Sequence, residues 1–193
     1  MTGAFVWNME ALAEEPTSVI NGDGTLTYTI KVRNDMKFSD GSKINAKNYI
    51  ASILANSTAV SVAAGGTGNS GMQIEGYEEF KAYTGEGDKV YFKGVQLIDD
   101  YTFAVTFLPE YADYYYVMSY ASYSPVPLAL YLGENDIVVN ADKSCGLSDG
   151  FYAKDGDSFT HAAHIEASAW DKTDAYPYSG PYCVECYNEA DKS

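Results

Sequence analysis

The sequence predicts an α+β fold built on a mainly antiparallel sheet, and three observations support that class. Residues 26–32 and 101–107 alternate apolar and polar side chains with period two, as strands with one buried face do. Asp99-Asp100 joins the second of these runs to a preceding apolar run, residues 91–98, as a hairpin turn would. No strand–helix–strand rhythm is visible, so helices are expected to lie against a sheet made of hairpins.

The N-terminal elements follow from turn and cap residues. In a lead-in over residues 1–22, residues 9–14 are expected to form a short helix that Pro16 ends. Residues 21–24, Asn-Gly-Asp-Gly, predict a tight turn before the first strand, and Asp40-Gly41 predicts another turn. Asn45 stands where a helix N-cap belongs. A helix is therefore predicted from there to about residue 55 or 57, with one apolar face: Tyr49, Ile50, Ile53 and Leu54.

The later elements are shorter. Residues 57–71 are small and glycine-rich, which predicts a loop. Residues 75–83 are expected to form a second helix. After the hairpin, residues 111–119 predict a short aromatic helix, and Pro127 opens another that ends at Gly133. From residue 134 to 179 the pattern weakens, which we interpret as loops with short elements.

Composition bounds the function. The chain has 193 residues, 46% of them hydrophobic, which is enough for one domain with a real core or for two small domains. It carries 12 Lys and Arg against 27 Asp and Glu, a formal charge of −15. Such a chain repels phosphate backbones and offers no basic patch to anionic lipid, so nucleic-acid binding is not expected. No apolar stretch approaches the roughly 20 residues that cross a bilayer, so no membrane span is expected.

The cysteines and the N-terminal sequence give information on the cellular compartment of the chain. The chain has three cysteines: Cys145, Cys183 and Cys186. An odd and small number does not indicate a disulfide framework, but a single bridge from Cys145 to one of the other two is compatible with the sequence. The first 15 residues lack the basic start and apolar core of a signal peptide. The chain is therefore expected to be either cytoplasmic or an excerpt of a longer precursor.

Five segments carry a resemblance to a known family. They are the run LTYTIKVRNDMKFSDGSKINAKNY at 26–49, IEGYEEF at 74–80 followed by Gly85, FKGVQLIDDYT at 92–102, SPVP at 124–127 and GPY at 180–182. In this order they resemble the extracellular solute-binding proteins of family 5, the oligopeptide-, dipeptide- and nickel-binding receptors of ABC importers. Residues 137–178 depart from the family pattern.

The resemblance implies an architecture. Family members have a first lobe, a smaller lobe inserted in it and a large third lobe, with the ligand between the first and third lobes. This chain resembles the smaller lobe. On that basis it is expected to be an excerpt of a longer protein. It is expected to be a single domain over 1–193, with a lead-in at 1–22, a family-like core at 23–133, a divergent insertion at 134–179 and a return segment at 180–193.

The same resemblance implies a function without catalysis. The chain would be part of the receptor of an ABC importer, on the extracellular face of the membrane or in the periplasm. Its partners would be the remaining lobes, the ABC permease and a peptide or small solute. The lobe would buttress the ligand cleft rather than bind alone, and the loop 57–71 would lie nearest its rim. No ligand-binding residue and no cofactor are assigned.

One metal hypothesis is open. His161 and His164 are spaced H-x-x-H, and Cys183 and Cys186 are spaced C-x-x-C, which together could make a Cys2His2 zinc site. In the family, however, the residues after GPY are extended, which would point the two cysteines to opposite faces. We therefore expect no metal. Cys183 also opens no obvious helix, so redox chemistry at this C-x-x-C is not expected.

Catalytic patterns are not evident. Asp99 with Asp100 and Glu78 with Glu79 could be paired carboxylates for glycoside hydrolysis. The first pair is better explained as a turn and the second as a solvated helix face. The glycine-rich residues 65–68 lack the Lys-Ser/Thr of a phosphate loop. An enzyme is therefore not expected.

The chain has 18 tyrosines, and one stretch is crowded with them. Exposed rings of this kind could stack on sugars or on peptide side chains, which favours an alternative function as a cell-surface adhesion or carbohydrate-binding module. We interpret them instead as part of an interface between sheet and helices, with hydroxyls that reach water. The stretch comprises Tyr111, Tyr114, Tyr115, Tyr116, Tyr120 and Tyr123.

Overall fold

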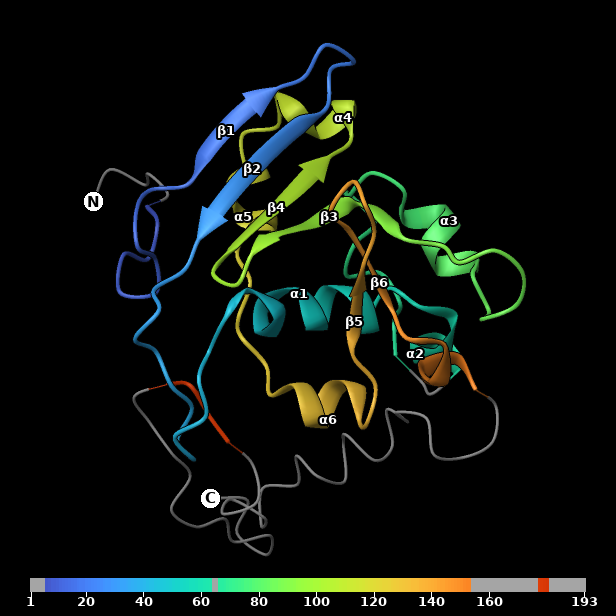
Figure 1. The fold of residues 1–193 in the computed structure, drawn as a ribbon. Helices are drawn as coiled ribbons and strands as arrows, with labels where there is room; N and C mark the ends of the chain where they lie inside the picture. The colour runs from blue at the N-terminus through green and yellow to red at the C-terminus, as the bar shows by residue number, and fades with distance from the viewer. Residues whose placement is uncertain (1–5, 64–65, 154–176, 181–193) are drawn as a thin grey trace, which may run out of the picture.

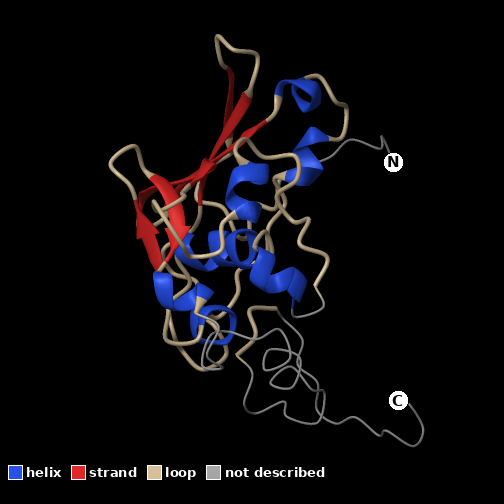
Figure 2. Ribbon diagram, turned by 90° about the vertical axis from the view of Figure 1, so that its right-hand side faces the viewer, coloured by secondary structure: helices blue, strands red, loops and turns tan. Residues whose placement is uncertain are grey.

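A six-stranded sheet forms the centre of the computed structural model, which describes residues 6–63, 66–153 and 177–180. All strand pairs are antiparallel. The main helices lie behind the sheet in Figure 1 and to its right in Figure 2. The predicted α+β class is confirmed. In spatial order the strands are β1 (Thr17–Ile20), β2 (Leu26–Lys31), β4 (Thr102–Phe107), β3 (Phe92–Asp99), β6 (Ser144–Leu147) and β5 (Ile137–Val139).

Helix α1 is the longest, and the predicted N-cap starts it. The side-chain oxygen of Asn45 accepts a hydrogen bond from the Lys47 amide at 3.0 Å, and the Asn48 side chain accepts one from the Asn45 amide at 2.9 Å. Asn48 also donates to the Val126 carbonyl at 2.9 Å, which ties α1 to the segment before α6. The helices are α1 (Ala46–Ala55), α2 (Ala59–Ala63), α3 (Tyr77–Ala82), α4 (Pro109–Ala112), α5 (Val117–Tyr120) and α6 (Leu128–Leu132), with a 3-10 turn η1 (Asp149–Tyr152).

The core lies between the sheet and α1, where aromatic rings dominate. Phe80 of α3 stacks on Phe92 of β3 with ring centroids 4.8 Å apart, and Tyr49 of α1 stacks on Phe103 of β4 at 5.8 Å. These rings are buried to 6% exposure or less. Burial of such large apolar surfaces is the main stabilising contribution available to a chain of this size.

The lead-in differs from the expected structure. Residues 9–14 form turns and an isolated bridge between Leu12 and Val32, so the predicted helix is wrong. The Ala13 amide donates to the Lys31 carbonyl at 2.9 Å, and the Arg33 amide donates to the Ala11 carbonyl at 3.1 Å. The open edge of β2 thus supplies backbone partners that a short isolated helix could not match.

Three further segments show in detail what the sequence indicated only broadly. The loop 57–71 contains α2, and the predicted helix at 111–119 is divided into α4 and α5. The segment 134–179, interpreted as loops with short elements, supplies β5 and β6, and β6 pairs with β3. The described part of this segment therefore adds two strands to the sheet.

Strand β4 is buried on both faces, although its sequence alternates. On the face away from α1, the Oγ1 atoms of Thr27 and Thr106 lie 2.9 Å apart and cover each other. The Glu75 amide donates to the Thr106 carbonyl at 2.9 Å, so the segment before α3 crosses the end of the strand. Alternation correctly predicted the strand, but a central strand has neighbours that cover even its short polar side chains.

Candidate functional site

A cleft of about 340 Å³ lies between the lead-in and the tyrosine-rich stretch. Its aromatic walls come from distant parts of the chain: Trp7, Tyr49 of α1, Phe103 of β4 and Tyr123. Three serines, at 119, 122 and 124, also line the cleft, and none of the described residues that line it is charged. In a chain with 27 acidic residues, such a lining suits a neutral group with an apolar face.

Tyr123 separates this cleft from a second, more open hollow beside α6. Its hydroxyl is buried without a hydrogen-bond partner among the described residues. Burial raises the pKa of Tyr123, so the phenol stays neutral. An unpaired buried hydroxyl destabilises the fold, because its bonds to water are lost and not replaced.

Replacing Tyr123 with phenylalanine is therefore expected to raise the free energy of unfolding by about 1 kcal/mol. Urea denaturation of the purified chain measures the change. Tyr77→Phe is the matched control, because the Tyr77 hydroxyl donates to the Gly68 carbonyl, and its loss should lower the stability. Destabilisation by Tyr123→Phe would show that this hydroxyl has a partner.

The buried phenol of Tyr49 is expected to make the free energy of unfolding depend on pH in the alkaline range. Burial raises its pKa to about 12 from 10.0. Between these values the unfolded chain releases the phenol proton while the folded chain keeps it. The free energy of unfolding should therefore fall as the pH rises above about 10, by up to about 1.4 kcal/mol per pH unit for this residue. Tyr49→Phe should reduce that slope in urea titrations at pH 9 to 11, and an unchanged slope would contradict the assignment.

The tyrosine-rich stretch divides into two parts. Tyr111, Tyr120 and Tyr123 are half-buried against the core, as interpreted from the sequence. Three consecutive rings at 114–116 are exposed, and Tyr115 is 70% exposed. The ring of Tyr114 stacks on Tyr120 with centroids 5.8 Å apart, so the exposed rings are anchored to the buried ones. The interface interpretation holds for half of the stretch only.

The segment 57–71, expected nearest a cleft rim, packs closely where the structure describes it. A Cβ on Gly71 would lie 2.7 Å from the Phe92 ring, and one on Gly68 would lie 2.2 Å from Val62. Helix α2 of this segment and helix α3 frame an open hollow of about 480 Å³, lined mainly by alanine and valine together with Glu78 and Lys81.

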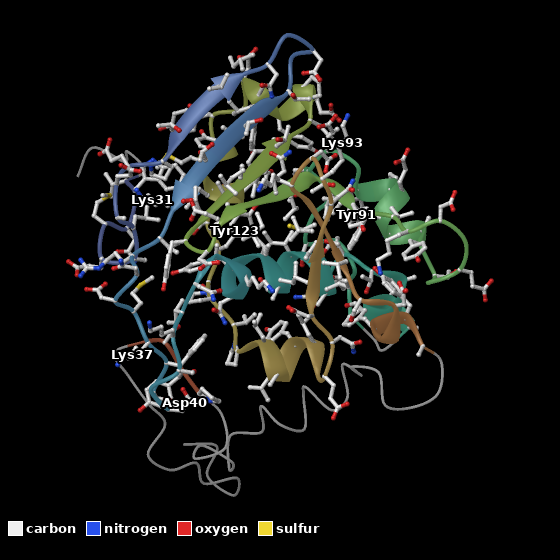
Figure 3. All side chains as sticks on the ribbon, in the orientation of Figure 1. Lys31, Lys37, Asp40, Tyr91, Lys93 and Tyr123 are labelled. Carbon is white, nitrogen blue, oxygen red and sulfur yellow. The ribbon has the colours of Figure 1, made fainter. Side chains whose placement is uncertain are left out.

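The predicted Asp40-Gly41 turn forms a small hairpin. The Asp40 carboxylate accepts hydrogen bonds from the Ser42 amide at 2.9 Å and from its hydroxyl at 2.6 Å, which lowers the pKa of Asp40. The Ser39 amide donates to the Tyr178 carbonyl at 2.9 Å, so the segment before Gly180 returns to this hairpin. Lys37 and Asp40 lie at the lower left of Figure 3, away from Tyr123.

The acidic pairs have structural roles. Asp99 accepts a hydrogen bond from the Tyr101 amide at 2.9 Å in the hairpin turn, and Glu78 and Glu79 lie exposed in the first turn of α3. No group of three His, Cys, Asp or Glu that could hold a metal occurs in the part of the chain that the structure describes.

The other metal and thiol candidates have different outcomes. His161, His164, Cys183 and Cys186 all lie outside the described residues, so the zinc hypothesis and the C-x-x-C interpretation stay predictions. Cys145 is buried in β6, where desolvation raises the pKa of its thiol to about 12. Both candidate partners for a bridge, Cys183 and Cys186, lie outside the described residues, so the bridge that the sequence left open stays a prediction.

Comparisons with known proteins agree with the segments quoted from the sequence. The family model of bacterial extracellular solute-binding proteins, family 5 Middle, matches residues 9–193. Among solved structures, a peptide-bound OppA of Listeria monocytogenes is similar, with 27% identity and a TM-score of 0.45. The match covers 62% of this chain and 22% of that protein.

Two further findings complete the comparison. A search of curated proteins found no match. Within the described residues, no helix has the length and apolar character that crossing a bilayer requires. The family model, by contrast, spans nearly the whole chain. The chain belongs to the bacterial extracellular solute-binding proteins of family 5.

Proposed function

We propose that the chain is the small lobe of a solute receptor that delivers peptides, or solutes of similar size, to an ABC permease. The family match over residues 9–193 carries this proposal. The receptor would act on the extracellular face of the membrane or in the periplasm. It would bind by closing its lobes around the ligand, with no covalent step and no cofactor.

The arrangement of the ends supports an inserted lobe. The lead-in bridges the end of β2 through Leu12 and Val32, and the returning segment bonds to the hairpin through Tyr178 and Ser39. Lys31 at the end of β2 and Lys37 and Asp40 of the hairpin all lie on the left-hand side of Figure 3. A chain that enters and leaves on one side can form a compact unit within another lobe.

The core supports a buttressing role. The stacked rings behind β3 and β4 and the capped helix α1 make one packed unit. Such a unit transmits force from one lobe to another with little deformation. Ligand contacts would then come mainly from the first and third lobes, with this lobe shaping the rim of the cleft.

A binding comparison tests the proposal. This chain and the product of its complete reading frame are each titrated with a mixture of tri- to pentapeptides, by calorimetry and by thermal unfolding. The longer product is expected to bind and to gain several degrees in Tm at saturating peptide, whereas this chain alone should show no saturable binding. Tight binding by this chain alone would contradict the buttressing role. A longer product that binds no peptide would contradict the peptide assignment.

A carbohydrate-binding module is the second candidate, because three consecutive tyrosines are exposed beside an uncharged cleft. Aromatic faces with neutral hydroxyls nearby are typical of sugar sites. Titration of this chain with neutral oligosaccharides tests it. Saturable binding that Tyr115→Ala abolishes would favour this function over the receptor lobe.

A further inference from the structure

Strand β1 leaves one edge of the sheet open, and the ladder shows which backbone groups face outward. The Asn21 amide donates to the Thr25 carbonyl at 2.8 Å, so residues 21, 19 and 17 turn their amides and carbonyls toward β2. Ser18 and Ile20 must therefore point theirs away from the sheet. On the far side of β2, the Val32 amide donates to the Tyr101 carbonyl at 2.9 Å, which confirms the same alternation.

The open edge is uncharged along its length, and its last two residues are apolar. All four residues of β1 are exposed, including Val19 at 60% and Ile20 at 63%. No charge and no proline lies within the strand; Pro16 and the acidic residues around it stand just outside. Edge strands are normally protected by such residues within the strand itself. Figure 1 shows β1 at the border of the sheet with no described element beside it.

The charges around β1 indicate which charge a partner of this edge should carry. Glu14 and Glu15 precede the strand and Asp23 follows it, all exposed. The Thr25 amide and hydroxyl donate to the Asp23 carboxylate, which lowers the pKa of Asp23 and keeps it charged. Lys31 approaches Glu14 at 3.5 Å, but no such ion pair occurs for Glu15 or Asp23 within the described ranges. Both ends of the open edge are therefore negative.

In the register that pairs both outward-facing residues, a second copy of the chain would fit this edge poorly. If the outward-facing Ser18 paired with Ile20 of the copy in an antiparallel ladder, the same register would set Glu15 opposite Asp23 of the copy. Like charges opposite each other in a sheet are destabilising. The overall charge of −15 adds to the repulsion.

We propose that the outer edge of β1 binds an extended segment of a partner polypeptide by strand addition. The segment has a short run of β-branched residues with lysine or arginine at both ends. Its backbone pairs with Ser18 and Ile20, its apolar side chains pack on Val19 and Ile20, and its cations meet the acidic ends of the strand.

Two synthetic octapeptides test the proposal on the isotope-labelled chain by NMR. One is Lys-Lys-Thr-Val-Thr-Val-Lys-Lys, and the other has glutamate in place of every lysine. The basic peptide should shift the amide signals of Ser18 and Ile20 in a saturable way, with an affinity that falls as salt is added. The acidic peptide should leave them unchanged. Equal binding of both peptides, or shifts confined to other elements, would overturn the proposal.

Ser18→Pro and Ser18→Ala form the matched pair. Proline removes the outward amide and leaves the bonds to β2 intact, as edge strands tolerate. Ser18→Pro should weaken binding about tenfold or more, and Ser18→Ala should change it less than about twofold. Thermal unfolding of both variants should match the parent chain within about 2 °C. Unaltered binding by Ser18→Pro would overturn the proposal, as would dimers of the unliganded chain that this substitution dissociates.

Discussion

Replacing Phe92 with alanine is expected to lower the free energy of unfolding by about 3–5 kcal/mol. The ring is fully buried, stacks on Phe80 at 4.8 Å and lies against Tyr77 at 6.4 Å. Phe92 also stands where β3 pairs with β6, opposite Cys145. The cavity left by alanine would therefore open at the junction of a helix and two strands, where backbone pairing resists collapse. Urea denaturation followed by circular dichroism measures the loss.

Tyr115→Ala is the control for this substitution. It also removes an aromatic ring, but one that is 70% exposed. Its effect should stay below about 1 kcal/mol, because little surface is taken from the core. Comparable losses for the two variants would contradict the packing described for Phe92.

Gly94→Ala is expected to cost about 3 kcal/mol or more, although it adds a single methyl group. An added Cβ would lie 2.8 Å from the Glu75 carbonyl oxygen, 2.8 Å from the Thr106 carbonyl oxygen and 2.6 Å from a methyl group of Ile74. The Gly94 amide donates to that same Glu75 carbonyl at 2.8 Å. Two of the three obstacles are backbone atoms, which cannot rotate away as a side chain can.

Gly22→Ala is the control for this substitution. It also replaces a glycine with alanine, but without steric overlap. No atom lies within 4 Å of the added carbon there, and the backbone is not left-handed. The stability should change by less than about 0.5 kcal/mol, and a small gain is the expected direction. Equal stability of the two alanine variants would contradict the close approach at Gly94.

The elements with strong local signals could be predicted from the sequence. The Asn45 cap, the Asp99-Asp100 turn and the helix between Pro127 and Gly133 each depend on residues a few positions apart. Strand β1 and strands β5 and β6 could not, because each has three or four residues and no alternation. These strands form because an already paired neighbour offers its edge, which is a tertiary effect.

The candidate cleft could not be predicted for a related reason. Trp7 is far from Tyr49, Phe103 and Tyr123 in the sequence and joins them only when the lead-in crosses the end of the sheet. The helix predicted over residues 9–14 gives no indication of that crossing. The local sequence there is Leu12 with an alanine on each side. This pattern is compatible with a weak helix and equally with a bridge at the edge of a sheet.

The order of strands in the sheet constrains how the chain is made. Lys31 of β2 pairs with Thr102 of β4, far along the chain, whereas β3 and β4 are joined by a tight turn. At the usual pace of a ribosome, β2 would wait on the order of several seconds for its partner. During that interval its apolar face has no native cover. The hairpin of β3 and β4 would then serve as the nucleus on which the earlier strands and the later ones assemble from opposite sides.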